Sequence, residues 1–240
     1  NSAYPLNSFD TFNEVSKKFR SSSFAPYILE GNTYAIPLTD TFSVMFYRTD
    51  VFRDLGIEPP RDWDEFYEVL QILQRNKMTV GIPVENTFFY TLIDQAGGSF
   101  FNEDLSEAQL LSNTSLGMFR MWTDLYKEYG LEVAYSFVNR FRSGEMPLAI
   151  ENYTQYLQLE VGAPEIKGLW KMIEVPGFKS ADGKVRNTIS GTGTAAVIMK
   201  NTDTPEAAWK FVEWFTDTDI QAQFGNDLES LLGSSGRYAT

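Results

Sequence analysis

Hydrophobic and polar residues alternate along the chain with two different periods. In several stretches apolar residues recur at every third or fourth position, which predicts amphipathic helices. Shorter stretches between them are rich in β-branched and aromatic residues, which is typical of strands. Because strands alternate with helices, the pattern predicts an α/β fold. We expect helices at residues 8–20, 63–73, 116–129 and 205–215, and strands at 34–37, 42–47, 80–84, 147–150, 170–175 and 195–199, with a polar break at 39–41 between the first two strands.

Two of these helices begin with capping signals. Asp62 stands at the N-cap of the helix at 63–73, with Glu65 three residues later as its reciprocal partner. Thr204 precedes the last helix, and Pro205 occupies its first position, where a missing N–H is tolerated. The residues predicted to face the core are Trp63, Phe66, Val69, Leu70 and Leu73 in the first of these helices, and Ala208, Phe211, Val212 and Phe215 in the second.

The absence of two residue types excludes several classes of enzyme and metal site. The 240 residues include no Cys, which excludes disulfides, thiol nucleophiles and thiolate metal sites. They include no His, which excludes serine hydrolases with a His base and most zinc enzymes. We therefore expect no metal site and no cofactor. Paired carboxylates can still catalyse glycoside hydrolysis, so that chemistry stays open.

Charge and aromatic content narrow the range of partners. The formal net charge is −12, which disfavours nucleic acid because phosphate binding depends on Lys and Arg. Aromatic residues make up 15% of the chain, and Tyr and Trp combine an apolar face with a polar group. Such side chains, together with carboxylates, would suit a sugar ring. No apolar run approaches the roughly 20 residues that a membrane-spanning helix needs, so we expect no such helix in this sequence.

Three segments carry motifs in a recognisable order and spacing. Residues 34–66 contain Tyr-Ala-Ile-Pro, Phe-Tyr-Arg-Thr-Asp, Leu-Gly-Ile and Pro-Pro-Arg-Asp-Trp-Asp-Glu-Phe in turn. Residues 141–150 read Phe-Arg-Ser-Gly-Glu-Met-Pro-Leu-Ala-Ile, and residues 205–215 read Pro-Glu-Ala-Ala-Trp-Lys-Phe-Val-Glu-Trp-Phe. Together these segments resemble the extracellular solute-binding proteins of ABC importers, the carbohydrate-binding family that includes maltodextrin-binding protein. The family usually has Asn where Arg48 stands and Thr where Asp62 stands.

The resemblance implies a type II periplasmic-binding-protein-like fold, in which two α/β lobes are joined by a hinge and hold the ligand in the cleft between them. Residues 1–42 would form part of lobe 1, residues 43–186 lobe 2, and residues 187–240 a return crossing and a further part of lobe 1. Family members are longer at both ends, so we expect lobe 1 to be incomplete and the chain to be truncated at both ends.

The resemblance also places ligand contacts in four segments. These are the first crossing segment, the segment after the strand at 80–84, the segment after the strand at 147–150, and the glycine-containing run at 190–193. Position by position, the candidate ligand-binding residues are Asp40 and Thr41; Glu85, Thr87, Phe88 and Tyr90; Glu151, Asn152, Tyr153 and Tyr156; and Gly191 and Thr192.

Several candidates also have a purely structural interpretation. The family's stacking Trp is absent, so Tyr153 or Tyr156 would replace it and the other would belong to the core. The structural alternatives are a turn for Asp40, a helix-end charge for Glu85, a core position for Phe88 and a tight turn for the run at 190–193.

The function implied by the resemblance is capture of a carbohydrate, an oligosaccharide in particular, for uptake by an ABC importer, without catalysis. The partners would be the sugar and the membrane permease subunits, and the chain would be a monomer. The location would be extracytoplasmic, in the periplasm or at the cell surface through a lipid anchor of the full-length protein. Two alternatives stay open: a binding protein for a peptide or a polyamine, favoured by the acidic candidates Asp40, Glu85 and Glu151, and a glycoside hydrolase that uses Glu85 and Glu151 as a carboxylate pair.

Overall fold

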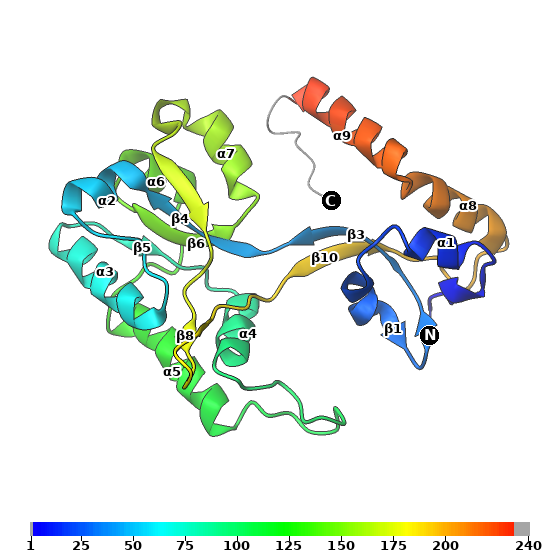
Figure 1. Ribbon diagram of the computed structural model, residues 1–240, viewed down its shortest axis with the longest axis horizontal. Helices are drawn as coiled ribbons and strands as arrows, with labels where there is room; N and C mark the ends of the chain where they lie inside the picture. Colours follow the sequence, from blue (N-terminus) through cyan, green and yellow to red (C-terminus); the bar gives the residue numbers. More distant parts are fainter. Residues whose placement is uncertain (1, 233–240) are drawn as a thin grey trace. The chain divides into compact units, whose positions relative to one another are not determined.

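The computed structural model describes residues 2–232, which form two compact units (Figure 1). The described part of unit 1 covers residues 2–40 and 192–232, and unit 2 covers Thr41–Gly191. Both units contain strands and helices, which confirms the predicted α/β class. The lobe boundaries implied by the resemblance, at residues 43 and 186, stay a prediction.

Unit 2 is built on a mixed sheet of four strands. Its order is β5-β6-β4-β7, with β5 parallel to β6, and with β4 antiparallel to both β6 and β7. Because β4 runs against β6, its first residue, Ser43, pairs with the last residue of β6, Asn152. The last residues of β5 and β6 and the first residue of β4 therefore lie at the same end of the strands. The strands are β4 (Ser43–Arg48), β5 (Val80–Gly81), β6 (Leu148–Asn152) and β7 (Trp170–Ile173).

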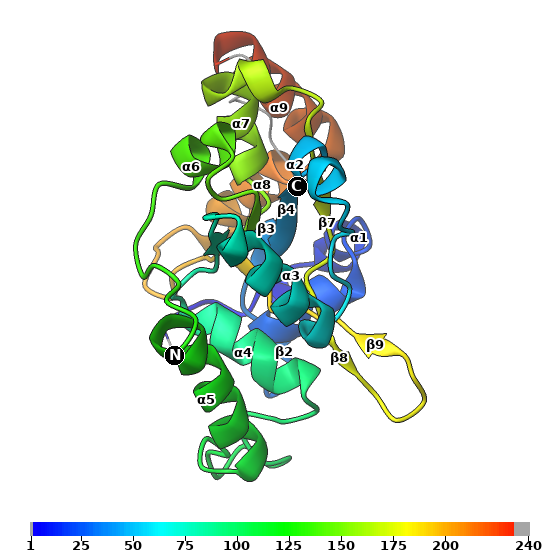
Figure 2. The same cartoon turned by 90° about the vertical axis from the view of Figure 1, so that its left-hand side faces the viewer.

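Alternate residues of β4 face two separate hydrophobic cores. Met45 belongs to a core formed with α3, α4 and α5, whereas its neighbour Phe46 belongs to a core formed with α6 and α7. Successive side chains of a strand point to opposite faces, so helices cover both faces of the sheet (Figures 1 and 2). The helices of unit 2 are α2 (Thr49–Leu55), α3 (Trp63–Arg75), α4 (Asn86–Gln95), α5 (Asn113–Lys127), α6 (Phe137–Ser143) and α7 (Gln155–Gly162), followed by the short η3 (Pro164–Ile166).

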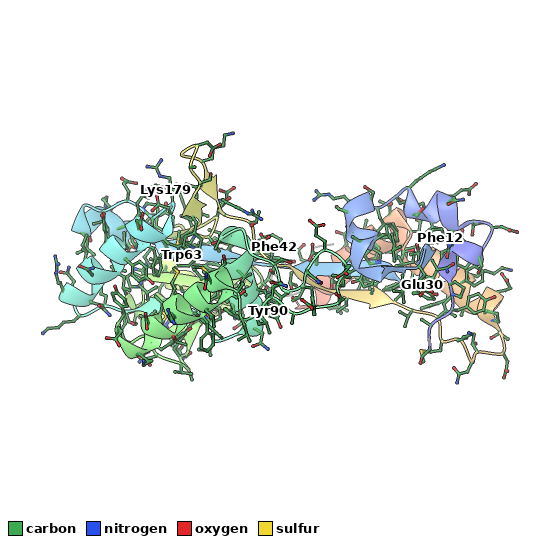
Figure 3. The ribbon with its side chains drawn as sticks, turned by 90° about the horizontal axis from the view of Figure 1, so that it is seen from below. Phe12, Glu30, Phe42, Trp63, Tyr90 and Lys179 are labelled. Atoms are coloured by element: carbon green, nitrogen blue, oxygen red, sulfur yellow. The ribbon has the colours of Figure 1, made fainter. Side chains whose placement is uncertain are left out.

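Helix α3 follows its sequence signals closely. All five residues of its predicted stripe are buried, and Trp63 lies inside the unit (Figure 3). Asp62 is the N-cap, since its Oδ1 accepts a hydrogen bond from the Glu65 N–H at 3.0 Å. The reciprocal bond differs from the prediction, because Glu65 Oε2 accepts from the N–H of Arg61, at 2.8 Å, instead of that of Asp62.

Asp62 also joins α3 to a hairpin that projects from the unit (Figure 2). The hairpin consists of β8 (Phe178–Lys179) and β9 (Val185–Arg186), and Lys179 Nζ lies 2.6 Å from Asp62 Oδ2. Burial alone would raise the pKa of Asp62, but the hydrogen bonds from Lys179 and from the Glu65 N–H outweigh it and hold the pKa below its ordinary value. The Asp62 carboxylate is therefore both a helix cap and an ion-pair partner.

Replacing Asp62 with Ala is expected to lower the free energy of unfolding by about 2 kcal/mol, the upper range for loss of an N-cap. Asp62→Thr keeps a capping oxygen but loses the Lys179 ion pair, so it should lose less. Because the pKa of Asp62 is lowered on folding, its contribution is present above the unfolded pKa of about 3.9 and disappears as the pH falls below it. Urea unfolding at pH 7 and pH 3 measures both effects. Equal losses for the Ala and Thr variants would show that capping is not the cause.

Unit 1 has its own core, in which aromatic rings stack. Phe9 and Trp209 lie parallel with ring centroids 5.0 Å apart, and Trp209 Nε1 donates to Thr11 Oγ1 at 2.8 Å. The elements of unit 1 are η1 (Leu6–Ser8), α1 (Phe12–Ser16), η2 (Ser21–Tyr27), β1 (Ile28–Leu29), β2 (Asn32–Thr33), β3 (Ile36–Thr41, which ends at the first residue of unit 2), β10 (Thr192–Ala196), α8 (Pro205–Phe215) and α9 (Thr218–Leu232).

Several predicted elements of unit 1 differ from the structure. The expected helix at 8–20 is only the short α1. On either side of it single turns with i→i+3 hydrogen bonds, from the Phe12 N–H to the Phe9 carbonyl and from the Phe19 N–H to the Ser16 carbonyl, give the apolar residues a similar spacing. The expected polar break at 39–41 lies inside β3, which pairs with β10. In α8, Trp209 and Val212 face the core while Phe211 is 59% exposed, because the stack on Phe9 draws Trp209 inward.

Candidate ligand-binding site

The acidic candidates lie at the end of the unit 2 sheet where strands β5 and β6 finish. Glu85 follows β5 and is the N-cap residue of α4, although its side chain makes no capping hydrogen bond. Glu151 and Asn152 are the last two residues of β6. The charges of Glu85 and Glu151 lie close enough to interact. Two carboxylates that are distant in the sequence are therefore brought together by the pairing of β5 with β6.

Glu151 is a half-buried carboxylate with a raised pKa. Burial is the main cause, and repulsion by Glu85 adds to it, while a hydrogen bond from Tyr135 opposes both; the result is a pKa of about 6. The Tyr135 hydroxyl donates to Glu151 Oε1 at 2.8 Å. No Lys or Arg among residues 2–232 forms an ion pair with Glu151 or Glu85. The site is therefore acidic and presents strong hydrogen-bond acceptors.

The structure separates the two candidate tyrosines. The ring of Tyr153 lies 4.9 Å from that of Phe42, which is 39% exposed, and the Tyr153 N–H donates to the Phe42 carbonyl at 3.0 Å. Tyr156 packs against the core that contains Phe46. Tyr153 is thus the tyrosine at this end of the sheet, and Phe42 is an aromatic neighbour that the sequence reasoning did not single out.

The side chain of Asn152 already has local partners. Its Oδ1 accepts from the N–H of Thr154 at 3.0 Å and from the Thr154 hydroxyl at 2.8 Å. These bonds shape the turn between β6 and α7, as Asn side chains often do. Asn152 therefore holds the chain of the site in place as well as being a candidate contact.

The three candidates on α4 point in different directions. Thr87 Oγ1 donates to Glu85 Oε2 at 3.3 Å, so it lies beside the carboxylate. Tyr90 is 39% exposed and touches Phe100 edge-on at 4.2 Å between ring centroids. Tyr90 and Phe42 both lie at the end of unit 2 where β4 begins (Figure 3). Phe88 instead belongs to the core, where it is 4% exposed and packs edge-on against Trp63, so we leave it out of the proposed site.

The remaining candidates lie on the segments that pass between the units. Asp40 and Thr192 belong to unit 1, while Thr41 and Gly191 are the first and last residues of unit 2. The run at 190–193 is no tight turn, because β10 begins at Thr192. A Cβ at Gly193 would lie 2.4 Å from the Thr39 carbonyl oxygen, so the close approach of β3 and β10 accounts for a glycine there.

Helix α4 holds the segment that leads to Gly191. Gln95 Nε2 donates to the Thr188 carbonyl at 2.9 Å, and the Ser190 N–H donates to Thr91 Oγ1 at 3.1 Å. Gln95 is itself buried and accepts from Trp63 Nε1 at 2.9 Å. The helix that follows Glu85 therefore also fixes the end of unit 2.

Tyr135 is the functional candidate that sequence reasoning missed. It lies in the loop between α5 and α6, just before the N-cap residue Ser136, and no periodic pattern or motif marks it. Its hydroxyl reaches Glu151 because the fold places this residue, 16 positions earlier in the chain, within hydrogen-bond distance of the last residues of β6. No local signal could have identified this contact.

Two further observations concern other kinds of site. Within residues 2–232, no group of three or more acidic side chains is placed to hold a metal ion. Over the same residues, none of the helices has both the length and the apolar character needed to cross a lipid bilayer.

Sequence comparison identifies one family and several relatives. Residues 4–222 match the family model described as bacterial extracellular solute-binding protein. An arabinooligosaccharide-binding protein of Halalkalibacterium halodurans is 24% identical over 245 residues, which cover 95% of this chain and 52% of the relative. A maltotriose-binding protein of Pyrococcus abyssi is 25% identical over 243 residues, covering 93% of this chain and 49% of the relative. The chain thus spans about half the length of these relatives.

Comparison with solved structures supports the fold. The sugar-binding protein MalE of Xanthomonas citri gives a TM-score of 0.74 at 16% identity, covering 98% of this chain and 64% of that one. The substrate-binding protein Lmo0181 of Listeria monocytogenes, solved with cycloalternan, gives 0.71 at 20% identity, covering 98% and 64%. These likenesses confirm the periplasmic-binding-protein-like architecture expected from the sequence.

Proposed function

Because the chain belongs to the bacterial extracellular solute-binding proteins, we propose that it captures an oligosaccharide for uptake by an ABC importer, without chemical change to the sugar. The arabinooligosaccharide- and maltotriose-binding relatives support this ligand class. The permease subunits of the importer would be the macromolecular partner, and the protein would act as a monomer. It would work outside the cytoplasm, in the periplasm or through a lipid anchor of the full-length protein.

The observation that carries this proposal is the set of carboxylates and aromatic rings at the end of the unit 2 sheet where β5 and β6 finish. Glu85 and Glu151 can accept hydrogen bonds from sugar hydroxyls, and bonds to ionised acceptors are the stronger ones. Tyr153 and Phe42 offer aromatic faces beside them for the C–H faces of a sugar ring. Thr41, Thr87, Tyr90 and Asn152 are further candidate contacts of unit 2, and Asp40, Gly191 and Thr192 stay candidates on the crossing segments.

A saccharide panel tests the proposal through thermal stability. A ligand at 100 times its Kd stabilises the folded state by about 2.7 kcal/mol, which raises the Tm by a few degrees. We expect linear oligosaccharides, including maltotriose and arabinotriose, to raise the Tm more than monosaccharides do. A Tm shift with spermidine or a tripeptide and none with any saccharide would favour the alternative ligand class. Release of reducing sugar during incubation would contradict the non-catalytic assignment.

A further inference from the structure

Tyr135 occupies a position that the neighbouring backbone makes available. A Cβ built at Gly81 would lie 3.0 Å from the Tyr135 hydroxyl and 2.7 Å from Met146 Sδ. The contact with Met146 is shorter than real Cβ contacts and the contact with Tyr135 is tighter than most of them, so the lack of a side chain at Gly81 leaves room for the hydroxyl. The ring of Tyr135 packs against the core shared by α6 and α7. Its hydroxyl is therefore held in one place beside the end of β6.

We propose that Tyr135 is a positioning residue of the ligand site: by donating a hydrogen bond to Oε1 of Glu151, it orients the carboxylate and leaves Oε2 to accept a hydrogen bond from a saccharide hydroxyl. This inference rests on the proposed function, because it assumes that Glu151 contacts the sugar. It assigns to the α5–α6 loop a role in affinity that the fold alone does not imply.

The charges around Glu151 explain why such a donor is needed. The titratable groups that face Glu151 are Tyr135 from the α5–α6 loop and Glu85 from the start of α4. Tyr126 of α5 contributes to the raised pKa of Tyr135. Burial and Glu85 both favour the protonated acid, so the Tyr135 hydrogen bond is the interaction that favours the carboxylate. Burial also raises the pKa of Tyr135 above its ordinary value, so the phenol keeps its proton for donation.

The proton state of Glu151 then links binding to pH. With a pKa of about 6, the carboxylate is ionised at pH 7.5 and largely protonated at pH 5. A protonated carboxyl is a weaker acceptor, so saccharide affinity should fall as the pH drops through about 6. Without Tyr135, this loss should begin at a higher pH.

The test compares Tyr135→Phe with the wild type and with Tyr67→Phe. Tyr67 is a partly buried tyrosine on α3 that packs against Tyr129, so its variant removes a phenol hydroxyl without touching Glu151. Carbon-13 NMR of labelled glutamate side chains, with the resonance assigned through Glu151→Gln, measures the pKa of Glu151. Calorimetric titration with maltotriose and with arabinotriose from pH 5 to pH 8 measures affinity.

We expect Tyr135→Phe to raise the pKa of Glu151 by about one unit and to weaken saccharide binding about tenfold at pH 7. The pH at which affinity falls should move upward by a similar amount, whereas Tyr67→Phe should change neither. An unchanged pKa of Glu151, or an equal loss of affinity at every pH, would overturn the inference while leaving the proposed function intact. If the wild type binds neither trisaccharide nor any member of the saccharide panel, the proposed function fails and this inference fails with it.

Discussion

Replacing Arg48 with Ala is expected to lower the free energy of unfolding by about 3 kcal/mol, the lower end of the usual effect of removing one partner of a buried ion pair, because the Asp50 side chain is 20% exposed. Arg48 is 7% exposed. Its Nη2 lies 2.6 Å from Asp50 Oδ2 and its Nε 2.9 Å from Asp50 Oδ1, so the two side chains form a bidentate ion pair. The hydrogen bonds from Arg48 hold the pKa of Asp50 below its ordinary value, although burial opposes this.

The second half of the Arg48 guanidinium joins β4 to the end of α6. Its Nη1 donates to the carbonyls of Phe141 at 2.8 Å and Arg142 at 3.0 Å. Truncation would therefore remove the ionic partner of Asp50 and the Arg48 donor of the Arg142 carbonyl, whereas the Phe141 carbonyl keeps its hydrogen bond from the Gly144 N–H at 3.2 Å. An Asn side chain is too short to replace all these bonds, so Arg48→Asn should also be strongly destabilising.

Guanidinium chloride unfolding at pH 7 measures the effect of Arg48→Ala. Arg53→Ala is the matched control, because its pair with Asp54 is 3.6 Å long and both side chains are 75% exposed. Such surface pairs contribute at most about 1 kcal/mol. A loss of less than about 1 kcal/mol for Arg48→Ala would contradict the structural role given to the pair.

Replacing Glu151 with Gln is expected to weaken oligosaccharide binding and at the same time to stabilise the free protein at pH 7.5. Binding should weaken about tenfold, since a neutral amide is a poorer acceptor than a carboxylate. Stability should rise because the pKa of Glu151 is raised from 4.5 to about 6 on folding, so the ionised group costs about 2 kcal/mol above both values.

The sign of this stability effect depends on pH. An acid whose pKa is raised on folding binds its proton more tightly in the folded state, so the wild type gains stability as the pH falls from about 6 to 4.5. Glu151→Gln should therefore be more stable than the wild type at pH 7.5, with the difference vanishing near pH 4.

Thermal unfolding at the two pH values and titration with maltotriose and arabinotriose check both parts of this expectation. Glu107→Gln, in an exposed loop, is the control and should change neither quantity. A variant that binds the trisaccharides as the wild type does would remove Glu151 from the site. A variant less stable than the wild type at pH 7.5 would show that the carboxylate serves the fold.

The family and much of the fold could be read from local patterns. Asp62 and the stripe from Trp63 to Leu73 predict α3 correctly, because capping and helical periodicity are decided within a few residues of the chain. The alternation of strands and helices likewise predicted the α/β class. Patterns failed where partners far along the chain decide which side faces inward, as with Trp209 and the exposed Phe211 of α8.

The candidate site divides in the same way. The sequence by itself determined the family, the acidic character of the site and the candidates Glu85 and Glu151, since these depend on motifs, residue types and their order. Only the tertiary structure decided that the two carboxylates lie close together, that Tyr153 pairs with Phe42, and that Phe88 is core. It alone placed the Tyr135 hydroxyl against Glu151, in the space that the missing side chain of Gly81 leaves. Such contacts join residues from different strands and loops, and the pairing of β5 with β6 that creates them leaves no periodic trace in the sequence.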